Sequence, residues 1–128
     1  GNLIRNVTRK RPVVLEAADV YGVGIAVEAD ASVTGNVIEN APGAGINVGW
    51  GAFMRDVSVV GNVVRTSRFG ISVSVASGAG SAIITGNMIS GAARGAIVGM
   101  DHAKAMTDDL IQEPTRYANL QIGGNRVR

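Results

Sequence analysis

The chain contains no cysteine, which excludes disulfide bonds, thiolate metal sites and cysteine nucleophiles. Aromatic residues make up only 4% of the 128 residues, and twelve basic against ten acidic side chains leave a net charge of +2. Because nucleic-acid sites need clustered basic and aromatic side chains, this composition argues against a nucleic-acid partner. No run of about 18 apolar residues occurs, so the sequence predicts no membrane-spanning helix.

The residues that are abundant are small or β-branched. Hydrophobic residues make up 46% of the chain, mostly as Val, Ile and Ala, and 18 residues are Gly. This composition favours many short strands joined by tight turns over helices. We therefore expect an all-β fold.

A Gly-Asn pair recurs five times along the chain, and each pair is followed, after one intervening residue, by Ile or Val. Successive pairs are 34, 26, 25 and 38 residues apart, at Gly1-Asn2, Gly35-Asn36, Gly61-Asn62, Gly86-Asn87 and Gly124-Asn125. A period in the twenties is typical of a solenoid. We expect each Asn to take the left-handed conformation of a sharp corner. The stacked amides of Asn2, Asn36, Asn62, Asn87 and Asn125 would form a structural ladder there. Type I′ hairpin turns in an antiparallel sheet are the less favoured interpretation.

A second motif, Gly followed by apolar residues at alternate positions, divides each repeat. It begins at Gly24, Gly45, Gly70 and Gly95, and a further short strand leads back to the next Gly-Asn pair. Three strands in about 25 residues predict one turn of a three-sided parallel β-helix, with about four coils in all. Alternation places Val73, Ala96 and Val98 in the core and Ile97 outside.

The chain is expected to form one β-helix segment over residues 1–128, interrupted by long insertions at 6–23 and 101–118. Part of the second insertion, residues 103–112, is predicted as a short helix. Because neither end carries a polar cap, we expect the segment to belong to a longer chain or to be covered by partner chains.

The pattern Gly-Asn-x-Ile/Val, a turn, then Gly-Ile-x-Val resembles the repeats of exported carbohydrate-active β-helix proteins. The resemblance covers residues 24–128 and, more weakly, 1–23, and it is closest to the uncharacterised twin-arginine-translocated repeat proteins of bacteria. It implies a right-handed helix, export to the periplasm or beyond, and an architecture like that of alginate epimerases and pectate lyases. Asp101-His102 is only a fragment of the epimerase Asp-Pro-His-Asp signature, so no catalytic residue is carried over.

Polar, aromatic and basic side chains gather beside the Gly-Ile strands, where they predict an acidic-glycan surface. Sugars stack on aromatic rings, and Arg binds carboxylates through two hydrogen bonds. The alternative is that the aromatic residues only cover core at the loops. The predicted substrate-binding residues are Trp50, Phe69, Arg68, Asn47, Ser72, Glu28, Lys104 and Arg116.

His102, the only histidine, lies beside Asp101 directly after the fourth Gly-marked strand. A neutral histidine can act as a general base. We therefore predict His102, Tyr117 and Arg94 as catalytic residues. The alternative is that His102 is a solvent-exposed loop histidine without a catalytic role. The acidic residues lack a metal-ligand spacing, so no metal or cofactor is predicted, although calcium is left open.

These patterns predict an exported module, periplasmic or extracellular, that binds or processes an acidic polysaccharide on the Gly-Ile face. If it is an enzyme, it would be a lyase or an epimerase. The alternative is a non-catalytic structural or interaction solenoid of the cell envelope. Its contacts would be end to end or along the outward apolar ladder of Leu3, Val37, Val63 and Met88.

Overall fold

The computed structural model describes residues 1–8 and 22–128, which form β-strands joined by short turns. In chain order the elements are β1 (Leu3–Arg5), β2 (Val23–Val27), β3 (Ala29–Thr34), β4 (Val37–Val48), the 3₁₀ turn η1 (Gly51–Phe53), β5 (Arg55–Val60), β6 (Val63–Ser74), β7 (Ala82–Thr85), β8 (Met88–Asp101), β9 (Lys104–Asp109), β10 (Leu120–Gly123) and β11 (Arg126–Val127). Most of the predicted insertion at 6–23, including Tyr21, lies outside the described residues.

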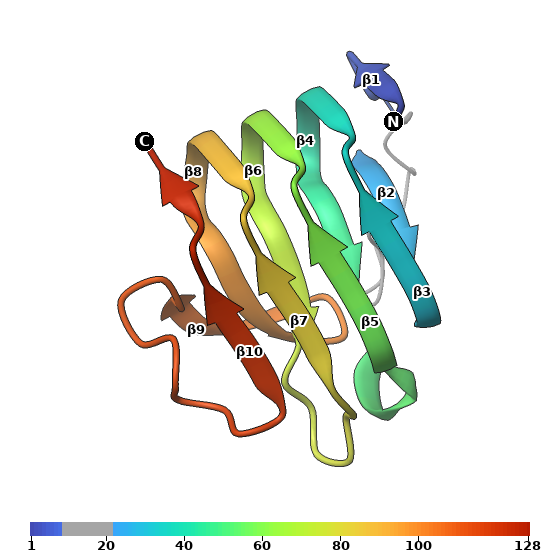
Figure 1. Cartoon of the computed structure of the whole chain (residues 1–128), viewed down its shortest axis with the longest axis vertical. Coiled ribbons are helices and arrows are strands. Elements are labelled where there is room, and N and C mark those ends of the chain that lie inside the picture. The colour runs from blue at the N-terminus through green and yellow to red at the C-terminus, as the bar shows by residue number, and fades with distance from the viewer. Residues whose placement is uncertain (9–21) are drawn as a thin grey trace.

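The strands form two sheets (Figure 1). The seven-stranded sheet has the order β1-β4-β6-β8-β11, with β2 paired to β4 and β9 paired to β8. Its strands pair in parallel except β8 with β9, which are antiparallel. The four-stranded sheet has the order β10-β7-β5-β3 and is parallel throughout.

The prediction of a right-handed, three-sided parallel β-helix is therefore wrong, and so is the solenoid description that went with it. The two strands that were expected on separate sides of each repeat are one long strand, as in β4 and β6. Asn40 and Thr66, at φ 57° and 59°, change the direction of these strands without ending the pairing. The result is one mixed sheet and one parallel sheet instead of three equivalent sides.

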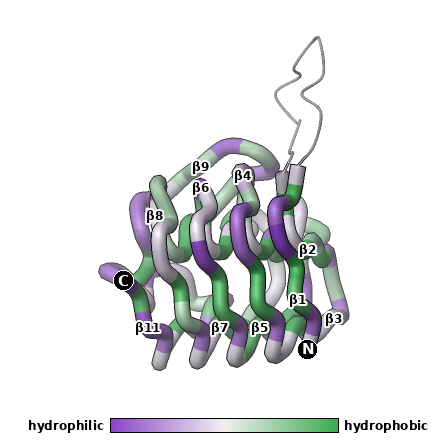
Figure 2. The backbone as a smooth tube through the Cα atoms, turned by 90° about the horizontal axis from the view of Figure 1, so that it is seen from above, coloured by the Kyte–Doolittle hydropathy of each residue, from purple (hydrophilic) through white to green (hydrophobic). Residues whose placement is uncertain are grey.

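The Gly-Asn repeat sets the register of the strands. Leu3, Val37, Val63, Met88 and Arg126, each directly after an Asn, pair with one another in order. Viewed from above, the strands of successive repeats lie side by side, and hydrophobic stretches recur at corresponding places (Figure 2). The repeat thus aligns equivalent residues of neighbouring strands.

The Asn residues of the repeat are joined by hydrogen bonds. The backbone N–H and side-chain amide of Asn2, Asn36, Asn62 and Asn87 each donate to Oδ1 of the next Asn, at 2.9–3.1 Å. The left-handed residue at this corner is the Gly and not the Asn as predicted, since Gly35, Gly61, Gly86 and Gly124 have φ between 62° and 70°. Glycine adopts this conformation without the steric cost of a Cβ.

The hydrophobic core lies between the two sheets. Ile38, Val64 and Ile71 from the larger sheet pack with Val59 and Ile84 from the smaller one, and all five are fully buried. Burying one such side chain is worth roughly 1.5–3 kcal/mol. This core occupies one face of the larger sheet and leaves the opposite face to carry a site.

The prediction of which β8 side chains point into the core is wrong by one residue. Ile97 pairs with Ile71 and belongs to the core, whereas Val98 packs in a second cluster with Ala44, Phe69 and Met100. The register between β6 and β8 shifts between Ser67 and Phe69, so Gly95 pairs with Phe69 and not with Gly70. One extra residue moves every following side chain to the other face of the sheet.

The segment after β8 folds back as a strand and not as the predicted helix over 103–112. β9 pairs antiparallel with β8. Leu110, the residue directly after β9, is buried in the core cluster. The carboxylate of Asp109 accepts hydrogen bonds from the backbone N–H groups of Ala96, Ile97 and Ile111. This segment therefore covers the edge of β8 and part of the core.

Candidate ligand-binding site

Several predicted substrate-binding residues meet in one cavity on the larger sheet. Asn47 and Ser72 alternate with the core residues Ile46 and Ile71, so they lie on the face away from the core. We call this cavity the central pocket; it has a volume of about 170 Å³, and its lining includes Asn47, Arg68, Phe69, Ser72, Met100 and His102.

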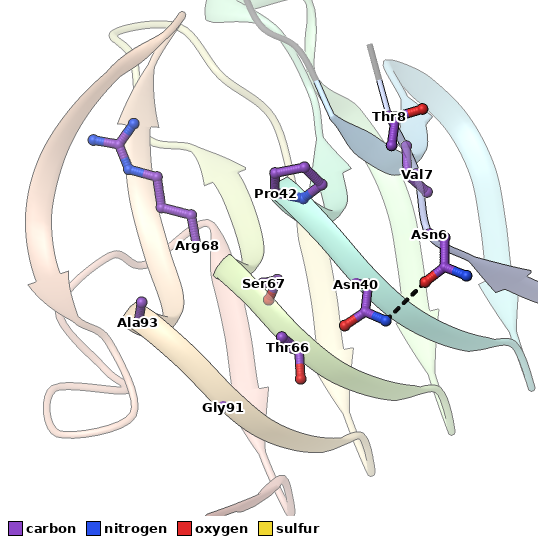
Figure 3. A pocket seen from close by; sticks show the side chains of 10 residues that line it. All are labelled: Asn6, Val7, Thr8, Asn40, Pro42, Thr66, Ser67, Arg68, Gly91 and Ala93. Atoms are coloured by element: carbon purple, nitrogen blue, oxygen red, sulfur yellow. Dashed lines mark hydrogen bonds between the residues drawn. The ribbon is translucent and has the colours of Figure 1, made fainter.

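A larger hollow, the outer groove, adjoins the central pocket. It has a volume of about 640 Å³ and crosses β4, β6 and β8 near the bend of these strands; its lining includes Val7, Asn40, Pro42, Thr66, Arg68 and Ala93 (Figure 3). Arg68 and Pro42 line both the outer groove and the central pocket. The two hollows are therefore neighbouring parts of one surface.

A third hollow, the Trp50 pocket, lies on the other side of the central pocket. Its volume is about 410 Å³, and its lining includes Val23, Ala26, Glu28, Asn47 and Trp50. Asn47 lines both this pocket and the central pocket. The predicted residues Glu28 and Trp50 thus lie beside Asn47, which links their pocket to the one that Ser72 and Arg68 line.

The polar side chains beneath the central pocket form hydrogen bonds with one another. Ser72 Oγ donates to Asn47 Oδ1 at 2.7 Å, and Asn47 Nδ2 donates to the carbonyl of Gly49 at 3.2 Å. Ser74 Oγ donates to the carbonyl of Gly51 at 2.6 Å, which anchors η1 to β6. Buried polar groups of this kind hold their positions because each lost bond is costly.

Arg68 stands over the ring of Phe69, with its guanidinium carbon 5.2 Å from the ring centroid. Phe69 is 9% exposed and packs in the second apolar cluster, whereas Arg68 is exposed. Stacking on an aromatic face uses the flat side of the guanidinium and leaves its in-plane N–H donors for a planar anion. Arg68 is thus a suitable anchor for a carboxylate.

His102 lies in the tight turn between β8 and β9, at φ 53°. Its Nδ1 is 2.7 Å from Oδ1 of Asp101, and both side chains are about half exposed, at 49% and 48%. Trp50 packs edge-on against the imidazole, with the ring centroids 5.2 Å apart. In the neutral tautomer whose Nδ1–H donates to Asp101, Nε2 is the acceptor, and this is the form that a general base needs.

Gly51 is a functional neighbour that sequence reasoning missed. A Cβ at this position would overlap Nε2 of His102, and Gly51 itself has φ 57°. The absence of a side chain therefore leaves room for the imidazole ring. The sequence offered no signal for this contact, because Gly51 and His102 are far apart in the chain.

The remaining predicted site residues lie elsewhere. Tyr117 packs against the core cluster under the guanidinium of Arg116, and Arg116 pairs with Glu113. Arg94 and Lys104 are exposed on β8 and β9, and neither lines the three hollows. Of the three predicted catalytic residues, His102 alone reaches the central pocket.

Other charged pairs stabilise the strands away from these hollows. Glu39 pairs with Arg5 and Arg65 on its two neighbouring strands. On the smaller sheet, hydrogen bonds from Arg55 lower the pKa of Asp30, and the same bonds raise the pKa of Arg55. Both groups of this second pair are fully exposed, so solvent screens it and its contribution to stability is small.

Within residues 1–8 and 22–128, no cluster of three or more His, Asp and Glu side chains is placed to hold a metal ion. None of the helices in the described part of the chain has the length and apolarity that a membrane crossing requires.

Comparison of the chain with protein-family models, with curated proteins and with solved structures found no match. The resemblance to twin-arginine-translocated repeat proteins therefore stays a prediction. What the protein does has to be argued from its own surface.

Proposed function

We propose that this protein binds an acidic glycan on the outer face of the seven-stranded sheet, with Arg68 as the carboxylate anchor. The observation that carries the proposal is the position of Arg68, which lines both the outer groove and the central pocket. An arginine fork binds a carboxylate through two parallel hydrogen bonds, and this geometry adds specificity as well as energy.

The neighbours of Arg68 suit a sugar. Asn47 and Ser72 supply amide and hydroxyl groups for ring hydroxyls, and Trp50 supplies an aromatic surface in the adjoining pocket. A location outside the cytoplasm, periplasmic or extracellular, belongs to the same proposal, since acidic polysaccharides are cell-surface polymers.

The catalytic form of the proposal depends on His102. In the neutral tautomer whose Nδ1–H donates to Asp101, Nε2 carries the lone pair that could take a proton from a bound sugar. Arg68 beside it would neutralise the carboxylate of that sugar. Binding itself requires only the anchor and the polar lining.

The test measures binding of polyuronates by calorimetry for the wild-type protein and for Arg68→Ala. We expect the variant to lose roughly tenfold to hundredfold in affinity, because charge-assisted hydrogen bonds contribute about 1.5–3 kcal/mol. Arg94→Ala is the matched control, since Arg94 is exposed on the same sheet but lines none of the three hollows.

Equal affinity of the two variants would contradict the role of Arg68. Failure of the wild-type protein to bind any acidic polysaccharide would instead favour an interaction module. Its contact surface would be the outward apolar ladder, in which Leu3 and Met88 are 58% and 47% exposed.

A further inference from the structure

The outer groove differs in chemistry from the central pocket beside it. Its lining includes the apolar groups of Val7, Pro42 and Ala93, and Arg68 is the only charged side chain among its described lining residues (Figure 3). The central pocket instead presents Asn47, Ser72 and His102. A ligand that covers both must combine polar and anionic groups with an apolar part next to the anion.

Six of the ten described lining residues of the outer groove are polar, but most of the surface that they expose to it is apolar. Asn40 Nδ2 donates to Asn6 Oδ1 at 2.8 Å, which engages one donor and one acceptor of this amide pair (Figure 3). Thr66 adds a hydroxyl beside a methyl group. The surface therefore suits a small apolar substituent with one hydrogen-bond acceptor more than it suits a bare polyhydroxylated ring.

We infer that the outer groove binds O-acyl groups, such as acetyl esters, carried by the acidic glycan whose carboxylate binds Arg68. The inference rests on the proposed function and narrows the ligand class to O-acylated acidic polysaccharides. An acetyl ester has an apolar methyl group for Val7, Pro42 and Ala93, and a carbonyl acceptor for the amide and hydroxyl donors of the outer groove.

The size and position of the outer groove support this assignment. A volume of about 640 Å³ is that of a small-molecule site, which can hold an acylated sugar unit. Because the outer groove shares Arg68 and Pro42 with the central pocket and both hollows span β4 and β6, a chain lying along the strands would place adjacent sugars in the two hollows.

The experiment compares O-acetylated polymannuronate and polygalacturonate with the same samples after alkaline deacetylation. We expect the wild-type protein to bind the acetylated form more tightly, by about fourfold for each buried methyl group. Ala93→Leu, which narrows the outer groove, should lower this preference, so that the ratio of the affinities for the acetylated and deacetylated forms falls toward one.

Ala105→Leu is the matched control, because Ala105 is also exposed on a strand but lines none of the three hollows. This variant should keep the wild-type preference. Circular dichroism of both variants would establish that they fold.

The outcomes separate this inference from the proposed function. Equal or weaker binding of the acetylated form would overturn the inference and leave acidic-glycan binding intact. If Ala93→Leu keeps the full preference for the acetylated form, the acyl group binds elsewhere, and the inference is overturned as well. Failure to bind either form would overturn both proposals.

Discussion

Asn62 is a buried polar residue whose backbone and side chain take part in several hydrogen bonds. It is 0% exposed, donates from its backbone and side chain to Asn87 Oδ1 and from Nδ2 to the carbonyl of Val33, and accepts two bonds from Asn36. The residue joins three successive repeats. Its removal would leave several buried groups without partners.

We expect Asn62→Ala to lower the free energy of unfolding by at least about 2 kcal/mol, because each buried group left unsatisfied costs about 1–3 kcal/mol. Urea unfolding would measure the loss. Asn2→Ala is the control: Asn2 is exposed, so its loss should be smaller. Similar losses for the two variants would contradict a structural role for the buried ladder. Glycan affinity per folded molecule should not change in Asn62→Ala.

Ser67 shows the opposite case. Its Oγ is the one buried side-chain polar atom without a hydrogen-bond partner in the described part of the chain. The residues that flank it in register are Ala41 and Ala92. The position is thus occupied by a methyl group on both neighbouring strands.

We expect Ser67→Ala to leave stability unchanged or to raise it by about 1 kcal/mol, since the change removes an unsatisfied hydroxyl. Ser72→Ala should instead destabilise by about 1 kcal/mol, because Ser72 donates to Asn47. Thermal unfolding of the pair distinguishes them. A clear loss in Ser67→Ala would mean that its hydroxyl has a partner.

At the scale of the element, β9 and the end of β8 depend on one carboxylate. Asp109 accepts three backbone N–H groups, two of them on β8 directly after Gly95. These N–H groups follow the shift in register between β6 and β8. Asp109 therefore compensates for pairing that the shifted strand lacks.

Asp109→Ala should reduce the free energy of unfolding by about 2 kcal/mol or more, because hydrogen bonds to a charged acceptor are the strong ones. Asp108→Ala, at the adjacent exposed position, should have almost no effect. Urea denaturation of the two variants checks this. Hydrogen exchange of the Ala96 and Ile97 amides should also quicken in Asp109→Ala, and unchanged exchange would contradict the assignment.

At the scale of the whole molecule, one face of the larger sheet serves packing and the other carries the candidate site. One face packs against the smaller sheet, and the other carries the central pocket, the outer groove and the Trp50 pocket. Stability variants such as Asn62→Ala should therefore leave binding intact. Surface variants such as Arg68→Ala should leave stability intact.

Part of the site was predictable from local patterns. Alternation placed Asn47 and Ser72 opposite Ile46 and Ile71, because side chains in a strand point to opposite faces in turn. The meeting of Arg68 and His102 in the central pocket was not predicted, because Arg68 precedes the third Gly-marked strand whereas His102 follows the fourth. The outer groove was not predicted, although a polar or small residue lies four positions after each of the first four Asn residues of the ladder, at Asn6, Asn40, Thr66 and Gly91.

The sequence by itself determined the strand register, since a Gly and a following Asn can be recognised wherever they recur and both act through local backbone geometry and hydrogen bonds. Only the tertiary structure decided that the Gly-Asn and Gly-Ile segments form one bent strand, that β9 folds back on β8, and that Ile97 replaces Val98 in the core. These outcomes depend on a left-handed Asn40 and Thr66 and on a one-residue shift after Ser67. Each depends on long-range pairing between strands, which local sequence patterns do not specify.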